Sequence, residues 1–254
     1  MLIDTHAHIY SEDYSDDIDQ VIERAYQCNV RKIVLPNIDS SSLKSMLDLS
    51  AAYPQICFPL IGLHPTSVNE DYEDELQLVD FWLSKRKFYG IGEIGIDLYW
   101  DKTFLNEQII VFRHQLQLAK KYSLPVVIHV RDSFEQVFGI LRPELDGKLT
   151  GVFHSFSGSL KQAQQVIDAG FKIGVNGIVT FKNSGLDKII REISPEHILL
   201  ETDSPYLTPV PFRGKRNESS YLIYIVHKIA ELHHTTVDEI ARITTENAEQ
   251  LFGI

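Results

Sequence analysis

Short apolar runs alternate with amphipathic segments along the whole chain, and this alternation constrains the fold more than any other feature. Eight runs rich in β-branched residues each lead into a polar turn, and most are followed by a segment with helical spacing. The predicted strands are Met1–Ile9, Arg31–Pro36, Ile56–Leu63, Tyr89–Ile96, Pro125–Val130, Gly151–Phe153, Phe171–Val175 and His197–Leu200. The predicted helices are Asp16–Cys28, Ser41–Tyr53, Glu73–Arg86, Leu105–Tyr122, Ser133–Leu141, Leu160–Ala169, Leu186–Ile193, Ser220–Leu232 and Val237–Leu251. Eight strands alternating with helices in 254 residues predict an α/β fold, a (β/α)8 TIM-type barrel, with a doubly wound open sheet as the alternative.

Helix boundary signals agree with this pattern. Ser159 and Thr236 stand where helix N-caps belong, Thr236 with Glu239 three residues on as a capping box, and Gly170 stands where a helix should end. No linker rich in Gly, Ser and Pro divides the sequence, so residues 1–254 are predicted to form a single domain. A dinucleotide-binding G-x-G-x-x-G turn and a P-loop are both absent from the sequence.

Charge and composition exclude several function classes. The 24 Lys and Arg residues against 35 Asp and Glu give a net charge of −11, which disfavours non-specific nucleic-acid binding through a basic surface but leaves room for a local cationic site. No stretch approaches the ~18 apolar residues that span a bilayer, so we expect no membrane insertion. The 2 cysteines, and the start Met1-Leu2-Ile3-Asp4 without a basic or long apolar segment, predict a reduced, cytoplasmic protein.

Polar residues gather where the predicted strands end, and in a parallel barrel these carboxyl ends form the reactive face. A lone histidine at a strand end is more often structural than a ligand, but 5 of the 10 histidines lie at such ends. The strand-end residues that we single out are Asp4, His6, His8, His64, Glu93, Asp97, His129, Arg131, His154, Glu201 and Asp203. This concentration favours a metal centre.

His6 and His8 are two residues apart on a predicted strand, so both side chains point to the same face. Imidazole and carboxylate together are the ligands of divalent ions in catalytic sites. The predicted ligands are His6, His8, Glu93, His129, His154 and Asp203. These are too many for one catalytic ion, so we expect two divalent ions (Mg²⁺, Mn²⁺ or Zn²⁺) sharing a carboxylate. Asp4 and Asp97 remain open as ligands, turn caps or acceptors for a ligating imidazole, and we favour the last.

Seven motifs in order along the chain resemble those of the TatD-like metal-dependent hydrolases of the amidohydrolase superfamily. They are D-T-H-A-H at 4–8, G-L-H-P at 62–65, G-E-I-G-I-D at 92–97, H-V-R at 129–131, H-S-F-S-G at 154–158, E-T-D-S-P-Y-L at 201–207 and R-G-K-R-N at 213–217. After the last motif the chain has Glu218-Ser219-Ser220 where relatives commonly have a proline, which affects only the expected conformation of that loop. A glutamate at position 93, with no lysine at the corresponding strand end, resembles this branch rather than branches that use a carbamylated lysine.

The resemblance implies a TIM-type barrel with two divalent metals and phosphodiester hydrolysis. By that resemblance His6 and His8 would bind one metal, His129 and His154 the other, and Glu93 would bridge them. Asp203 would bind metal and take the proton of the attacking water, and His64 would polarise the phosphate or assist the leaving group. Glu201 would support a ligand from behind.

We therefore expect a nuclease, most simply a deoxyribonuclease that acts as a 3'-5' exonuclease, with nucleic acid as substrate and no obligate protein partner. Arg131, Arg213 and Lys215 would hold phosphates, although the last two could also be solvated loop charges. Loop aromatics could stack bases or simply cover the barrel mouth: Tyr99, Trp100, Phe156, Tyr206 and Phe212. Two alternatives stay open, a hydrolase of carboxylic esters, lactones, amides or aminoacyl-tRNA esters and a non-catalytic metal-binding module.

Overall fold

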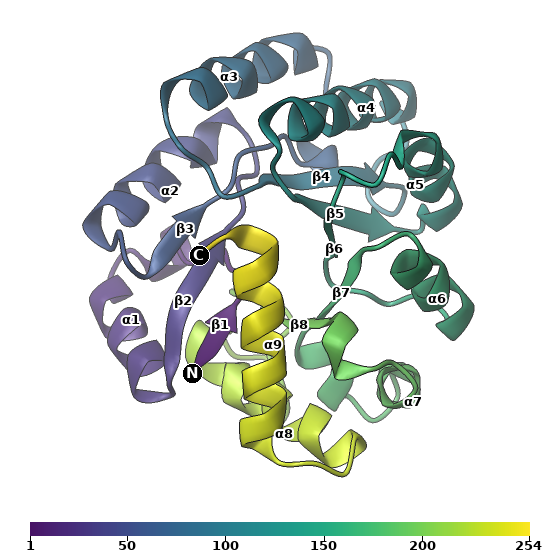
Figure 1. The fold of residues 1–254 in the computed structure, drawn as a ribbon. Helices are drawn as coiled ribbons and strands as arrows, with labels where there is room; N and C mark the ends of the chain where they lie inside the picture. The colour runs from purple at the N-terminus through teal and green to yellow at the C-terminus, as the bar shows by residue number, and fades with distance from the viewer.

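The eight predicted strands form a closed parallel barrel in the computed structural model, which describes residues 1–254 (Figure 1). The strands are β1 (Leu2–Asp4), β2 (Val30–Leu35), β3 (Cys57–Pro59), β4 (Ile91–Asp97), β5 (Val126–Arg131), β6 (Gly151–Phe153), β7 (Lys172–Val175) and β8 (Ile198–Leu200). Ladders join β1-β2-β3 and β4-β5-β6-β7-β8. Parallel bridges from Ile61 to Ile91 and from Ala7 to Ser204 connect these two sets. The (β/α)8 barrel is confirmed and the open sheet is wrong.

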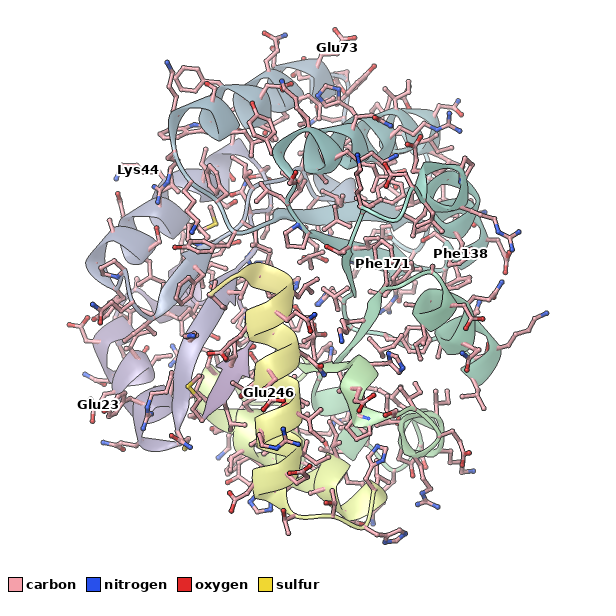
Figure 2. The ribbon with its side chains drawn as sticks, viewed as in Figure 1. Glu23, Lys44, Glu73, Phe138, Phe171 and Glu246 are labelled. Atoms are coloured by element: carbon pink, nitrogen blue, oxygen red, sulfur yellow. The ribbon has the colours of Figure 1, made fainter.

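Helices surround the barrel on the outside (Figure 1). They are α1 (Ile18–Gln27), α2 (Ser40–Ala52), α3 (Tyr72–Lys85), α4 (Leu105–Tyr122), α5 (Phe134–Leu141), α6 (Leu160–Asp168), α7 (Leu186–Arg191), α8 (Leu222–Leu232) and α9 (Val237–Phe252). Phe138 and Phe171 are buried between helices and strands, whereas Glu23, Lys44 and Glu73 extend outward from their helices (Figure 2). None of the helices is both long and apolar enough to cross a bilayer.

Helix bounds agree with the sequence pattern to within two residues, because the capping signals act locally. Ser159 accepts a hydrogen bond from the Gln162 amide in a capping box, and Thr236 accepts one from the Glu239 amide. Gly170 follows α6 with a φ of +84°, which glycine adopts without strain.

The predicted strand Met1–Ile9 is too long. Regular pairing ends at Asp4, because the residues that follow bond alternately to both neighbouring strands. The Thr5 amide donates to Leu200 O of β8, and the Ala7 amide donates to Val34 O of β2. The predicted strand Ile56–Leu63 shortens to Cys57–Pro59 for a similar reason, since the Ile61 amide turns to Gly90 O before β4.

One end of the barrel interior is filled with apolar side chains and covered by α9. Seven barrel residues and two from this helix form one buried cluster: Ile3, Val34, Phe58, Leu60, Val127, Val152, Leu199, Ala248 and Phe252. Figure 1 shows α9, coloured yellow, lying across this end beside the N-terminus. With that end closed, the polar strand ends open at the opposite, carboxyl end.

Candidate metal centre

The strand-end histidines and carboxylates meet in one cavity at the carboxyl end of the barrel. Residues two apart on a strand share a face, so the inward direction of Val127 and Val152 continues in His129 and His154. The cavity has a volume of about 470 Å³. Its lining includes His8, His64, Glu93, Asp97, His129, Arg131, His154 and Asp203.

Glu93 lies at the centre of the site, and its two carboxylate oxygens face different histidines. Oε2 is 3.1 Å from His6 Nε2 and 3.7 Å from His8 Nε2. Oε1 is 2.7 Å from His129 Nδ1 and 3.5 Å from His154 Nε2. The two oxygens therefore face different pairs of imidazoles, the arrangement that the resemblance implies for a bridging ligand. The His6 and His154 rings themselves stack, with centres 3.5 Å apart.

Two glycines in β4 let this strand lie close to β5 and so bring Glu93 near His129. A Cβ on Gly92 would lie 2.7 Å from the Val127 Cβ, and one on Gly95 would lie 2.0 Å from the His129 carbonyl oxygen. Gly95 also has a φ of +147°, a conformation that favours glycine. Both glycines therefore permit close packing of the β4 and β5 backbones.

Asp203 completes the group around His6 and His8. Its Oδ1 lies 3.8 Å from the Nε2 atoms of both histidines and 3.9 Å from His154 Nε2. The residue has a φ of +56°, which turns the chain after β8 and directs its carboxylate into the cavity. Asp203 thus lies within 4 Å of three imidazoles, those of His6, His8 and His154.

A buried tyrosine fixes the orientation of His8. The Tyr10 hydroxyl donates to Pro36 O at 2.5 Å, and it lies 2.8 Å from His8 Nδ1. Because the hydroxyl proton is used on Pro36, His8 must donate from Nδ1, which leaves an unprotonated Nε2 facing the cavity. Sequence reasoning missed Tyr10, although it follows His6 and His8 at the same spacing of two.

His64 has the opposite tautomer. Its Nδ1 accepts from the Thr66 amide at 3.1 Å and lies 2.7 Å from the Thr66 hydroxyl. The neutral ring therefore carries its proton on Nε2, which lies 3.3 Å from Glu93 Oε1. His64 is arranged to donate a hydrogen bond into the cavity rather than a lone pair to a cation.

Carboxylates support the other two histidines from behind. Asp97 Oδ2 lies 2.9 Å from His129 Nε2, and Glu201 Oε1 lies 3.2 Å from His154 Nδ1. Such outer carboxylates set the orientation of ligating imidazoles. Asp97 therefore lies where the sequence predicts an acceptor for a ligand, whereas Glu201 contacts His154 as an ion-pair partner without hydrogen-bond geometry.

Asp4 does not accept a hydrogen bond from a ligating imidazole, the role that we favoured for it. It accepts hydrogen bonds from the Thr202 amide at 2.9 Å and the Thr202 hydroxyl at 2.6 Å, and its only contact with His6 is the backbone amide. The Asp4 carboxylate thus joins the ends of β1 and β8 and does not hold an imidazole.

Burial and charge shift the pKa values of these groups in opposite directions. Burial lowers the pKa of His8 to about 4 and raises the pKa of Asp203 to about 7. Burial would also lower the pKa of His154, but Glu201, Glu93 and Asp203 together raise it to about 10. Burial by itself would raise the pKa of Glu93. The surrounding imidazoles outweigh this effect and hold its pKa well below the usual range.

The donor set fits divalent cations. Donor atoms lie within 4.8 Å of one another in three groups: His6, His8 and Asp203; His6, Glu93 and His154; His64, Glu93 and His129. In the third group only Glu93 and His129 could ligate, because His64 carries its proton on Nε2. The Nε2 atoms of His6 and His8 are 3.2 Å apart, and each lies 3.8 Å from Asp203 Oδ1. Nitrogen lone pairs and carboxylates that converge in a buried space are the chemistry that a bound cation satisfies.

The predicted phosphate-binding residues do not gather at one place. Arg131 lines the cavity, and its guanidinium lies 4.6 Å from the centre of the Tyr99 ring. Arg213 lies instead against the Phe181 ring at 4.2 Å, beside a separate surface hollow. Lys215 lines a third hollow, with Arg24 and Glu218.

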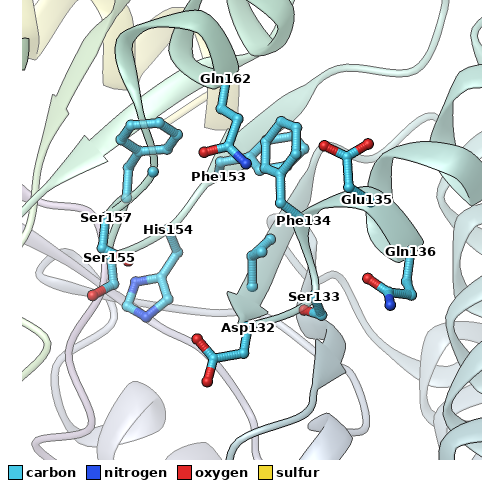
Figure 3. A pocket seen from close by; sticks show the side chains of 13 residues that line it. Asp132, Ser133, Phe134, Glu135, Gln136, Phe153, His154, Ser155, Ser157 and Gln162 are labelled. Carbon is cyan, nitrogen blue, oxygen red and sulfur yellow. The ribbon is translucent and has the colours of Figure 1, made fainter.

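Another hollow directly adjoins the metal cavity and lies between the segments that follow β5 and β6. It has a volume of about 340 Å³ and shares His154, Ser155 and Ser157 with the main cavity. The carboxylates of Asp132 and Glu135 line it (Figure 3). Their charge makes this hollow unfavourable for a phosphate.

Comparison with known proteins places this geometry in a family. The family model described as TatD related DNase matches residues 3–253. An uncharacterized metal-dependent hydrolase of Bacillus subtilis, YabD, is 42% identical over 100% of both chains.

The chain belongs to the TatD family of metal-dependent hydrolases.

Solved structures agree with that assignment. The TatD homologue YjjV of Escherichia coli has a TM-score of 0.94 at 32% identity, with 100% of this chain and 98% of that chain covered. A lactonase from Listeria monocytogenes shares the fold at a TM-score of 0.70 and 12% identity, covering 99% of this chain and 94% of that chain. The barrel by itself therefore does not fix which bond is hydrolysed.

Proposed function

We propose that this protein is a two-metal nuclease that hydrolyses phosphodiesters at the end of a nucleic-acid strand, most simply as a 3'-5' deoxyribonuclease in the cytoplasm. The position of Glu93 carries the proposal, because each of its oxygens faces a separate group of imidazoles. Two ions on either side of a shared carboxylate are suited to in-line displacement at phosphorus.

His6 and His8 would hold one ion with Asp203. His129 and His154, whose ring centres are 6.4 Å apart, would hold the other. Glu93 would be shared between them. When bound, two divalent ions such as Mg²⁺, Mn²⁺ or Zn²⁺ lower the pKa of a water molecule and offset the charge that develops on phosphate.

Asp203 is suited to take the proton from the attacking water. Its carboxylate reaches into the cavity beside the imidazoles that would hold the ions, where an ionised oxygen can accept a proton. His64 is suited to the opposite side of the reaction, because Thr66 keeps the proton on the Nε2 that faces the cavity. From there it would donate to a phosphate oxygen or to the leaving oxygen.

Arg131 is the cationic side chain best placed to orient the scissile phosphate, since it lines the cavity itself. Arg213 and Lys215 lie beside other hollows of the surface. In the proposed function they would contact phosphates further along a longer strand.

The test is a metal-reconstituted digestion of single- and double-stranded DNA and RNA, scored by product length. The matched control is Asp203→Asn, because asparagine tolerates the left-handed backbone at this position and keeps the shape of the side chain. We expect a ladder of mononucleotide steps with the wild-type chain and none with a folded Asp203→Asn variant. Intact strands with every ion, together with turnover of lactones, amides or aminoacyl esters, would replace the nuclease by a carbonyl hydrolase on the same site.

A further inference from the structure

The structure divides the five loop aromatics into covered and open rings. Phe156 is buried, and Phe212 is stacked on Tyr221 with ring centres 4.7 Å apart. Tyr99, Trp100 and Tyr206 remain open, with 53%, 76% and 58% of their surfaces exposed. The Arg131 guanidinium lies 4.6 Å from the centre of the Tyr99 ring, which leaves Trp100 and Tyr206. Both also line the cavity that contains Glu93. Large apolar rings left in water at the rim of a reactive cavity point to a binding role.

The two rings come from opposite sides of the barrel mouth. Trp100 follows β4 and Tyr206 follows β8, and three strands separate β4 from β8 in either direction around the closed ring (Figure 1). A substrate that reaches Glu93 therefore passes between two aromatic surfaces.

The backbone of each ring residue is hydrogen-bonded to a residue of the candidate metal centre. Asp97 Oδ1 accepts hydrogen bonds from the Tyr99 amide at 2.9 Å and the Trp100 amide at 3.1 Å, while its Oδ2 faces His129. The Tyr206 amide donates to Asp203 O at 2.9 Å. The positions of both rings are thus tied to residues of the metal centre.

We propose that Trp100 and Tyr206 stack unpaired nucleobases on either side of the scissile phosphodiester, so that the site selects unpaired strand ends. This inference rests on the proposed nuclease function. A base inside a duplex has both faces covered by its neighbours, whereas an unpaired base offers a face to an aromatic ring. Arg131, stacked on Tyr99 next to Trp100, supplies the adjacent positive charge for the phosphate. The acidic hollow of Asp132 and Glu135 keeps the phosphates out of the neighbouring groove.

The chain contains only 2 tryptophans, so stacking on Trp100 can be observed directly. Trp82→Phe leaves Trp100 as the sole tryptophan, and Trp100→Phe leaves Trp82 as the control. The probe is a short phosphorothioate thymidine oligonucleotide, which resists hydrolysis, titrated once in EDTA and once with Mn²⁺. We expect saturable quenching of Trp100 emission and no change for Trp82. An abasic oligonucleotide and a blunt duplex should quench several-fold less. Equal quenching by the abasic strand, or no quenching in either condition, would overturn the proposal.

Truncation of each ring gives a second, independent measurement. Trp100→Ala and Tyr206→Ala should each weaken binding of the oligonucleotide about tenfold, the effect of one base–aromatic stack. Phe81→Ala is the matched control, because Phe81 on α3 is 53% exposed and does not line the cavity. Losses no larger than that of Phe81→Ala would remove the stacking site. Quenching without hydrolysis of any strand would support the stacking site and refute the nuclease. Hydrolysis without quenching would support the nuclease and refute the stacking site.

Discussion

Replacing Tyr10 by Phe should weaken metal binding without any change to a proposed ligand. The hydroxyl accepts from His8 Nδ1 and donates to Pro36 O, and Tyr10 is only 8% exposed. Its loss leaves two buried polar groups without partners, at about 1–3 kcal/mol each, so we expect the free energy of unfolding in EDTA to fall by about 2–6 kcal/mol. His8 also becomes free to rotate or change tautomer. Loss of such an outer partner lowers metal affinity by about 10- to 100-fold, or about 1.4–2.8 kcal/mol.

Tyr14→Phe is the matched control for this variant. Tyr14 is equally buried and also loses a hydrogen bond to a carbonyl, that of Asn217, but it has no contact with an imidazole of the site. Urea unfolding should show a loss of about 1–3 kcal/mol for this control. Competition with a chelating dye should show unchanged Mn²⁺ affinity. If Tyr10→Phe keeps the Mn²⁺ affinity of Tyr14→Phe, the assigned tautomer of His8 is refuted.

Two further predictions follow from the same site. Metal binding should release protons, because the pKa of Asp203 is about 7 and that of His154 is about 10 in the metal-free protein, and both must deprotonate to act as ligands. Affinity should therefore rise with pH, and calorimetry in buffers of different ionisation enthalpy should show fewer protons released at about pH 8 than at about pH 6; a constant release would contradict these assignments. Gly174→Ala should lower stability by about 1–3 kcal/mol and weaken metal binding, because its Cβ would lie 2.5 Å from Glu201 Oε2 and displace the carboxylate behind His154. The control is Gly139→Ala in α5, where nothing lies within 4 Å of the new Cβ, and it should instead stabilise the helix by up to about 1 kcal/mol. Equal effects of the two variants in urea unfolding and in Mn²⁺ titration would refute the argument.

The fold and most of the site were predictable because both depend on periodicity. The period of two that directs Val127 and Val152 into the barrel also directs His129 and His154 into the cavity. Closure of a parallel barrel then brings residues that are distant in sequence to one face. Glu93 could be placed at this face from its strand alone.

Loop paths and local hydrogen bonds were not predictable in the same way. No periodicity directs the segment after β8, so sequence reasoning could not separate Arg131 at the cavity from Arg213 beside Phe181. Asp4 was expected to hold an imidazole, but the close approach of β8 gives its carboxylate the Thr202 amide and hydroxyl instead. The proton positions on His8 and His64 depend on Pro36 and Thr66, whose contacts appear only in three dimensions.

The most direct test of this account is the number and position of bound ions. Anomalous diffraction from crystals grown with Mn²⁺ would locate each ion relative to Glu93. We predict two peaks, one beside His6 and His8 and one beside His129 and His154, separated by about 3.5–4 Å as in other two-metal sites. A single peak, or a second ion away from Glu93, would contradict the two-metal arrangement on which the proposed reaction depends.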